Sequence, residues 1–147
     1  MRQSARDVGF VAALSAALIF GFVEPSLCQD GSLAEAVQVA QEAWLRHDVK
    51  VLVSKSDTVR LHIPDLPPSA SLRPGQASRL LDRYLSPTEE ISFELENVRE
   101  LAEDHAYAEV IRVFVVRGTV EECEETVFLG FRRIRGTWRL REVRVTP

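Results

Sequence analysis

The sequence predicts an α+β fold in which two to three N-terminal helices pack on a curved, mainly antiparallel sheet. Two observations support this prediction. The stretch 91–145 contains four consecutive strand-like runs separated by short turns, and the stretch before it contains segments with apolar residues at helical spacing. One earlier strand, over residues 57–64, completes the expected sheet, and Pro64 ends it. Because a curved sheet needs an apolar layer on its concave side, the helices and the sheet should form one packed unit.

The N-terminus has the layout of a secretory signal peptide. Arg2 and Arg6 precede sixteen uncharged, mostly apolar residues (8–23), and small residues stand at positions −3 and −1 of a cut after Cys28. Sixteen residues are short for a membrane span, which needs about 20. We therefore expect residues 1–28 to be a cleaved signal peptide, with no stable membrane span after cleavage.

Cleavage would leave residues 29–147 as a single domain, exported to the periplasm or the exterior. An uncleaved anchor and a lipid-modified Cys28 are the alternatives. Leu27 argues against the lipid, because a small residue should precede a modified cysteine. Cys123 would then have no intramolecular partner, so the domain would depend on its hydrophobic core rather than on a disulfide.

Two amphipathic helices are predicted before the sheet. Ser32 and Glu35 form a capping-box pattern, and apolar residues from Leu33 to Trp44 recur at helical spacing after it. Residues 49–54 are ambiguous, with a short helix as one alternative. A second helix is predicted over 77–85, followed by a helix-breaking proline at position 87.

The four C-terminal runs have the period of two that is typical of strands. The run 107–117 is apolar on both faces in its middle, which predicts a central, well-covered strand. In the run 138–145 the alternation changes phase at Arg141 and Glu142, which predicts a β-bulge. One face of the third run is expected to carry Cys123, Glu125, Val127, Leu129 and Phe131.

The composition limits the classes of partner. The 147 residues carry a net charge of −4, which gives no general attraction to nucleic acid. The charge is uneven: residues 86–128 carry twelve acids and three arginines, whereas residues 129–147 carry six arginines and one glutamate. Either these charges pair between neighbouring strands, or a basic rim meets an acidic partner or anionic lipid.

Motifs for metal or cofactor chemistry are missing from the sequence. The three histidines have no paired spacing, and there is no Cys-x-x-Cys, Gly-x-Ser-x-Gly, phosphate loop or dinucleotide fingerprint. We therefore expect no metal, no cofactor and no recognisable catalytic set.

The order helix, short helix, strand, helix and four-strand meander resembles the nuclear transport factor 2-like superfamily, which includes ketosteroid isomerases and polyketide cyclases. The likeness rests on residues 57–64, on residues 75–85, and on Phe131 with the hairpin residues 136–140. It implies a cone-shaped domain, most similar to small exported bacterial domains of unknown function. The candidates for a ligand pocket in such a cone are Trp44, Tyr84, Phe93, Asn97, His105, Tyr107, Phe131 and Trp138.

Two further expectations concern polar residues at the mouth of such a cone. Asn97 and Arg99 should interrupt the inward face of the first meander strand. His105, Tyr107 and Glu109 share one face of the next strand, either as part of a pocket mouth or as a solvated strand end.

The expected function is a non-catalytic binding or interaction domain. It would hold a small apolar ligand or form a homodimer through the outer face of the sheet. The dimer hypothesis rests on the strand 107–117, in which one of two apolar sets must face away from the helices: either Val110, Phe114 and Val116, or Ile111, Val113 and Val115. The alternative is a small isomerase, cyclase or hydro-lyase, which requires at least two titratable groups converging in an enclosed pocket.

Overall fold

The computed structural model describes residues 31–147, so the expected signal peptide lies outside the described residues. These residues form three helices and five strands, and the α+β prediction is confirmed. In chain order the elements are α1 (Leu33–Leu45), α2 (Val49–Val53), β1 (Arg60–His62), α3 (Pro74–Leu85), β2 (Thr88–Ala102), β3 (His105–Val116), β4 (Glu122–Ile134) and β5 (Thr137–Thr146).

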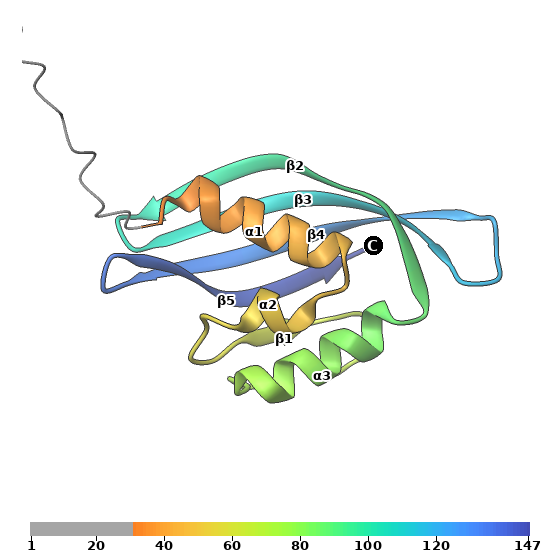
Figure 1. Cartoon of the computed structure of the whole chain (residues 1–147), viewed down its shortest axis with the longest axis horizontal. Helices are drawn as coiled ribbons and strands as arrows, with labels where there is room; N and C mark the ends of the chain where they lie inside the picture. The colour runs from red at the N-terminus through yellow and green to blue at the C-terminus, as the bar shows by residue number, and fades with distance from the viewer. Residues whose placement is uncertain (1–30) are drawn as a thin grey trace, which may run out of the picture.

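The sheet has the order β1-β5-β4-β3-β2. Strands β2 to β5 form the predicted antiparallel meander, and β1 pairs in parallel with β5. The helices lie together on one side of the curved sheet, and the β3–β4 hairpin extends beyond them (Figure 1). None of the helices in residues 31–147 is long and apolar enough to cross a membrane.

Local sequence signals explain where the helices begin. The Ser32 hydroxyl accepts a hydrogen bond from the Glu35 backbone N–H at 3.2 Å, which satisfies one of the free donors of the first turn of α1. Helix α3 begins earlier than the apolar pattern predicts. Pro74 occupies its first turn, and the side chain of Gln76 accepts a bond from the Arg73 backbone N–H at 3.1 Å.

Bulges give the sheet its curvature. The pairing of β4 with β5 shifts between Gly130 and Phe131, leaving Arg141 without an opposite residue, so the predicted bulge is confirmed. Strand β2 contains three further register shifts, at Ile91, Glu96 and Leu101. Each shift changes which residues of β2 face the helices.

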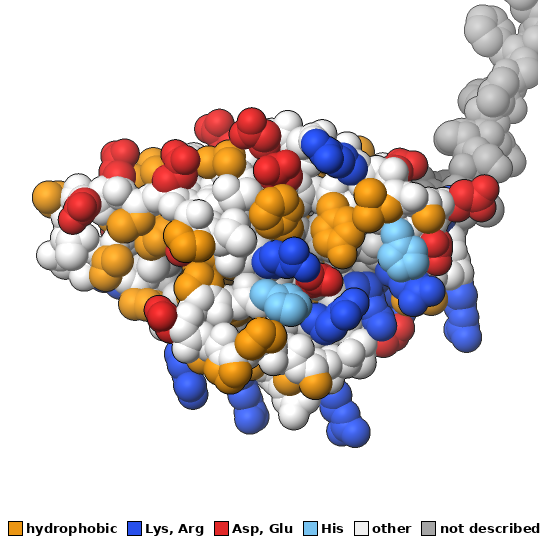
Figure 2. Space-filling model, turned by 180° about the vertical axis from the view of Figure 1, so that it is seen from behind, with side chains coloured by type: hydrophobic (Ala, Val, Ile, Leu, Met, Phe, Trp, Pro, Cys, Tyr) orange, Lys and Arg blue, Asp and Glu red, His pale blue; other side chains and the backbone are white. Residues whose placement is uncertain are grey.

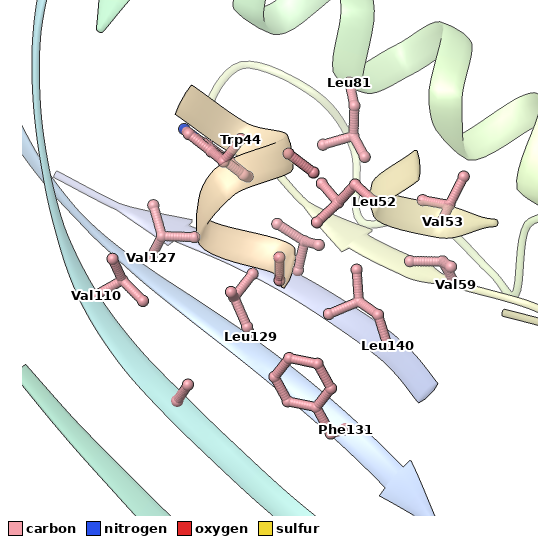
Figure 3. Packing of buried hydrophobic residues seen from close by; sticks show 14 of the residues in the cluster. Trp44, Leu52, Val53, Val59, Leu81, Val110, Val127, Leu129, Phe131 and Leu140 are labelled. Carbon is pink, nitrogen blue, oxygen red and sulfur yellow. The ribbon is translucent and has the colours of Figure 1, made fainter. Parts of the chain in front are cut away.

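The core fills the concave side of the sheet. Trp44 from α1 and Leu81 from α3 are fully buried against Val110 and Leu129 of the sheet. Phe131 and Leu140 continue this layer toward the β4–β5 end, and Leu52 of α2 belongs to the same buried cluster (Figure 3). Burying a side chain of this size stabilises the fold by about 1.5–3 kcal/mol, so the helices are held mainly by the apolar face of the sheet.

Candidate functional site

A buried arginine lies on the concave face of the sheet, toward the β3–β4 hairpin. Arg112 lies on β3 in phase with Val110 and Phe114, and its side chain is fully buried. Burying a charge is costly unless it is paired and hydrogen-bonded. The groups around Arg112 must therefore balance its charge and accept its hydrogen bonds.

Every N–H of the Arg112 guanidinium has an acceptor. The Nε and Nη2 groups donate to the two carboxylate oxygens of Glu90, at 2.9 and 2.6 Å. The Nη1 group donates to Glu125 Oε2 and to the Tyr84 hydroxyl, both at 2.8 Å, and Nη2 also donates to the Thr88 hydroxyl at 2.8 Å. These five residues, which we call the Arg112 cluster, use all five donors of the guanidinium.

Aromatic rings enclose the Arg112 cluster. The Arg112 Cζ atom lies 3.9 Å from the ring centroid of Phe114, 5.0 Å from that of Tyr84 and 5.6 Å from that of Trp44. Trp44 in turn stacks on Phe93, with centroids 4.7 Å apart. A cation over ring faces is favourable, and more so where water is excluded. The cluster is thus held by charge, hydrogen bonds and π contacts together.

The electrostatics keep the buried groups charged. Burial alone would raise the pKa of the Glu90 carboxyl, but the hydrogen bonds and charge of Arg112 outweigh it and hold the pKa below its usual value. Burial likewise opposes the charge of Arg112, and Glu90 reverses this and raises the pKa of the guanidinium. His47 Nε2 lies 3.1 Å from Glu90 and adds another partner.

Tyr84 is locked into the same cluster. Its hydroxyl donates to Glu125 and accepts from Arg112. Burial, followed by the bond to Glu125, raises the pKa of Tyr84 well above that of an exposed tyrosine. General acid–base catalysis needs a group with a pKa near the working pH and within reach of a substrate. Neither Glu90, with its lowered pKa, nor Tyr84, with its raised pKa, meets that condition, so the cluster has the properties of a structural ion network.

The structure divides the predicted pocket residues among three regions. Trp44, Tyr84 and Phe93 surround the Arg112 cluster. Phe131 and Trp138 are buried at the other end of the core, beside a small cleft below α1 and α2. The remaining three candidates, Asn97, His105 and Tyr107, line hollows on the face of the sheet that points away from the helices, which we call the outer face.

The expectation that Asn97 and Arg99 interrupt the inward face is wrong. Leu95 pairs with the buried Val110, but Asn97 pairs with the next residue, Glu109, because Glu96 is a bulge residue without a partner. The bulge moves Asn97 and Arg99 to the outer face, where they line a hollow of about 330 Å³ together with the other residues of its wall: Leu101, Tyr107, Glu109, Phe128 and Arg144.

Tyr107 and Gly130 form a close contact on the outer face. They are paired across β3 and β4, and a Cβ atom added to Gly130 would lie 3.0 Å from the Tyr107 ring and 3.1 Å from Glu142 Cβ. Glu142 is almost fully buried and pairs with Arg144 at 2.9 Å, while Arg60 and His62 each lie 3.8 Å away. His62 therefore has a structural charged neighbour.

The other singled-out polar residues also have structural partners. Asp57 accepts a hydrogen bond from Arg139 Nη1 at 3.1 Å. His105 Nδ1 lies 2.7 Å from Asp104, and this contact lowers the pKa of the exposed Asp104 carboxyl. Among residues 31–147 there is no group of three or more His, Cys, Asp or Glu residues placed to hold a metal ion.

The comparisons with known proteins agree with this architecture. A ketosteroid isomerase-like protein from Erwinia carotovora atroseptica covers 82% of this chain and 99% of its own, with 14% identity and a TM-score of 0.67. A protein of the nuclear transport factor 2-like family from Streptomyces avermitilis covers 78% of this chain and 91% of its own, with 22% identity and a TM-score of 0.60. The name of that protein proposes a dehydratase activity.

A DUF4783 family protein from Bacteroides uniformis covers 74% of this chain and 93% of its own, with 15% identity and a TM-score of 0.62. The sequence matches no protein-family model and no curated protein. At these identities the similarities establish the fold alone. The chain has the nuclear transport factor 2-like fold, as its sequence predicted.

Proposed function

We propose that this chain is an exported, non-catalytic interaction domain that self-associates through the outer face of its sheet. One observation carries the proposal. Val110 and Phe114 are buried under the helices, so the other apolar set of β3, made of Ile111, Val113 and Val115, faces outward and remains only partly covered. An apolar patch at the centre of a sheet face is typical of an interaction surface.

The charges of the outer face favour a second copy of this chain as the partner. Around Ile111, Val113 and Val115 the paired residues of the neighbouring strands include Glu89, Glu94, Glu122 and Glu124. At the other end of the face the hollows are lined by five arginines, namely Arg60, Arg99, Arg132, Arg141 and Arg144. In the view from behind the sheet, several basic side chains lie next to histidines in one part of the surface, and others project from its lower edge (Figure 2).

This arrangement is self-complementary. A two-fold axis that lies in the interface and crosses the strands near Phe128 would place the acidic half of one copy over the basic half of the other. Opposite charges would then meet at both ends, and the apolar set of β3 in each copy would be covered by the other copy. A nucleic acid or an anionic membrane would match only the basic half.

The interior argues against the alternative of an isomerase, cyclase or hydro-lyase. Such an enzyme needs at least two titratable groups free to act on a substrate inside the cone. Arg112 and the two carboxylates of its cluster are instead bonded to one another within a shell of aromatic rings. A substrate would have to break these buried pairs before it could reach them.

Analytical ultracentrifugation over a range of protein concentrations tests the proposal. The unsubstituted chain should sediment at twice the monomer mass, and salt should weaken the dimer because exposed charge pairs are screened. Val113→Glu should raise the dissociation constant of the dimer at least tenfold. Val120→Glu is the matched control: Val120 is 97% exposed at the tip of the β3–β4 hairpin, off the sheet face. A monomer at all concentrations, or a dimer that V113E leaves intact, would refute the proposal.

A further inference from the structure

A cleft on the helical side of the molecule has the chemistry of a small-ligand site. It lies between α1, α2 and the β4–β5 hairpin, has a volume of about 140 Å³, and we call it the α1–α2 cleft. Its wall includes Ala36 and Ala40 of α1, Leu52 of α2, and Phe131, Trp138 and Leu140 of the sheet. A cavity of about 150 Å³ with an apolar lining accommodates one benzene molecule, so one six-membered ring or a short branched chain would fit.

One end of this cleft is cationic. The residues Ser54, Lys55, Ser56, Thr137 and Arg139 also line a second hollow, of about 270 Å³, that continues the cleft toward solvent. Lys55 and Arg139 therefore stand where the apolar space opens. Asp57 neutralises part of this charge, but it is shared between Arg139 at 3.1 Å and Arg141 at 3.9 Å. With Lys55 included, this end of the cleft keeps a net positive charge.

A buried donor lies at the same end. The Nε group of Arg139 is inaccessible to solvent and has no hydrogen-bond partner within residues 31–147. Buried polar groups are nearly always bonded, so Arg139 would gain a hydrogen bond if its side chain turned the Nε group toward an acceptor in the cleft that it lines. A carboxylate accepts well from arginine and from lysine. Of the residues from Gly31 onward, Glu35 is the only acid that lines the apolar part of the cleft, and it comes from α1 rather than from the Lys55 loop.

We propose that the α1–α2 cleft binds a small monocarboxylate with an apolar body about the size of one aromatic ring. The apolar body lies against Trp138 and Leu52, and the carboxylate accepts hydrogen bonds from Arg139 and pairs with Lys55. This site is separate from the outer face, so it does not depend on the proposed self-association.

Phenylacetate is a suitable probe, and NMR titration of the isotope-labelled full chain is a suitable assay. Its carboxylate and ring match the two ends of the cleft, and 2-phenylethanol has nearly the same shape without the charge. We expect saturable shifts of the Trp138 indole N–H and the Arg139 side-chain N–H, with a dissociation constant in the millimolar range, as expected for about ten non-hydrogen atoms. The indole signal of Trp44, which does not line the cleft, should stay in place.

The two lysines of the chain provide a matched pair of variants. Lys55→Gln should weaken phenylacetate binding about threefold to tenfold, whereas Lys50→Gln, on α2 outside the cleft, should leave it within about twofold of the unsubstituted chain. The monomeric V113E variant should bind as well as the unsubstituted chain, which separates this site from self-association.

Three results would overturn the inference. If phenylacetate and 2-phenylethanol bind with equal affinity, the carboxylate contributes nothing to binding. If Lys55→Gln and Lys50→Gln change the affinity equally, Lys55 does not contact the carboxylate. Cleft signals that do not move at any concentration would also overturn it, including the case in which residues before Gly31 fill the cleft.

Discussion

Replacing Arg112 with methionine should be the most destabilising single change in the interior. The variant keeps a long apolar side chain but removes the guanidinium that bonds to both Glu90 and Glu125. The side chains of these two acids are only 2% and 15% exposed, so both would stay buried without their arginine partner. Breaking a buried ion pair from one side costs about 3–5 kcal/mol, which is a large part of the 5–15 kcal/mol that holds a typical domain folded.

The dependence of this loss on pH identifies its cause. In the unsubstituted chain Arg112 holds the pKa of Glu90 below its usual 4.5, so the stability from this pair is complete above pH 4.5 and is lost as the pH falls through the folded-state pKa. Without Arg112, the burial that raises the pKa of Glu90 is opposed only by the hydrogen bonds of His47 and Thr88, so the pKa of Glu90 rises. The charged Glu90 carboxylate of the variant then destabilises the fold at pH 7. As the pH falls, this carboxylate is protonated and its burial costs less free energy.

Urea unfolding followed by circular dichroism at pH 7 and pH 4.5 measures both effects. The difference in unfolding free energy between R112M and the unsubstituted chain should be about 3–5 kcal/mol at pH 7. It should be smaller at pH 4.5 by about 1 kcal/mol or more, since one pKa unit corresponds to about 1.4 kcal/mol. Arg46→Met, at a side chain 76% exposed, should cost less than about 0.5 kcal/mol. A cost for R112M below about 1 kcal/mol, or the same cost at both pH values, would refute this reasoning.

Three further variants test local packing in the same urea assay. Ser32→Ala should cost about 1 kcal/mol because α1 loses its N-terminal cap, and Ser78→Ala, inside α3, should cost less than half of that. Gly130→Ala should cost about 1–3 kcal/mol by crowding Tyr107, and a Y107S background that failed to relieve this cost would contradict the contact. Tyr84→Phe should cost about 1–3 kcal/mol because it removes a hydroxyl bonded to two buried charged groups, and an unchanged midpoint would mean that this hydroxyl contributes nothing.

The arrangement of elements could be predicted from sequence because it follows from local patterns. Periods of two and 3.6, the Ser32 cap and the short turns between the strand runs each act over a few residues, and each is confirmed. Arg135 and Gly136 both adopt positive φ, at 52° and 81°, as a two-residue hairpin turn requires. The phase change at Arg141 was also sufficient to predict a bulge, because the alternation of that strand is otherwise strict.

The bulges of β2 could not be predicted in the same way. The apolar spacing changes from two to three between Leu95 and Val98, but both side chains are more than a third exposed, so this phase change specifies the register weakly. The prediction for Asn97 failed for this reason: the register is weakly specified wherever neither face is clearly apolar.

The Arg112 cluster was missed although its parts were visible. Glu125 was assigned correctly to the inward face of β4, and an inward carboxylate needs a partner. Arg112 is the only charged residue between Glu109 and Arg117, and it is in phase with Val110 and Phe114. Pairing β3 with β4 in register would have placed it opposite Glu125. The contribution of Glu90 and Tyr84 depends on how α3 meets β2, which no local pattern encodes.

The position of the cluster has a consequence for where this fold can bind anything. Arg112 joins β2, β4 and the end of α3 through bonds whose geometry allows one arrangement, so it fixes the helices over the sheet near the β3–β4 hairpin. Opening a ligand site there would expose or unpair buried charges, and each costs several kcal/mol. Binding at a surface avoids that cost. The outer face and the α1–α2 cleft lie on opposite sides of the sheet, and neither includes a residue of the Arg112 cluster. The interior therefore stabilises the domain, while the two surfaces remain free to bind separate partners.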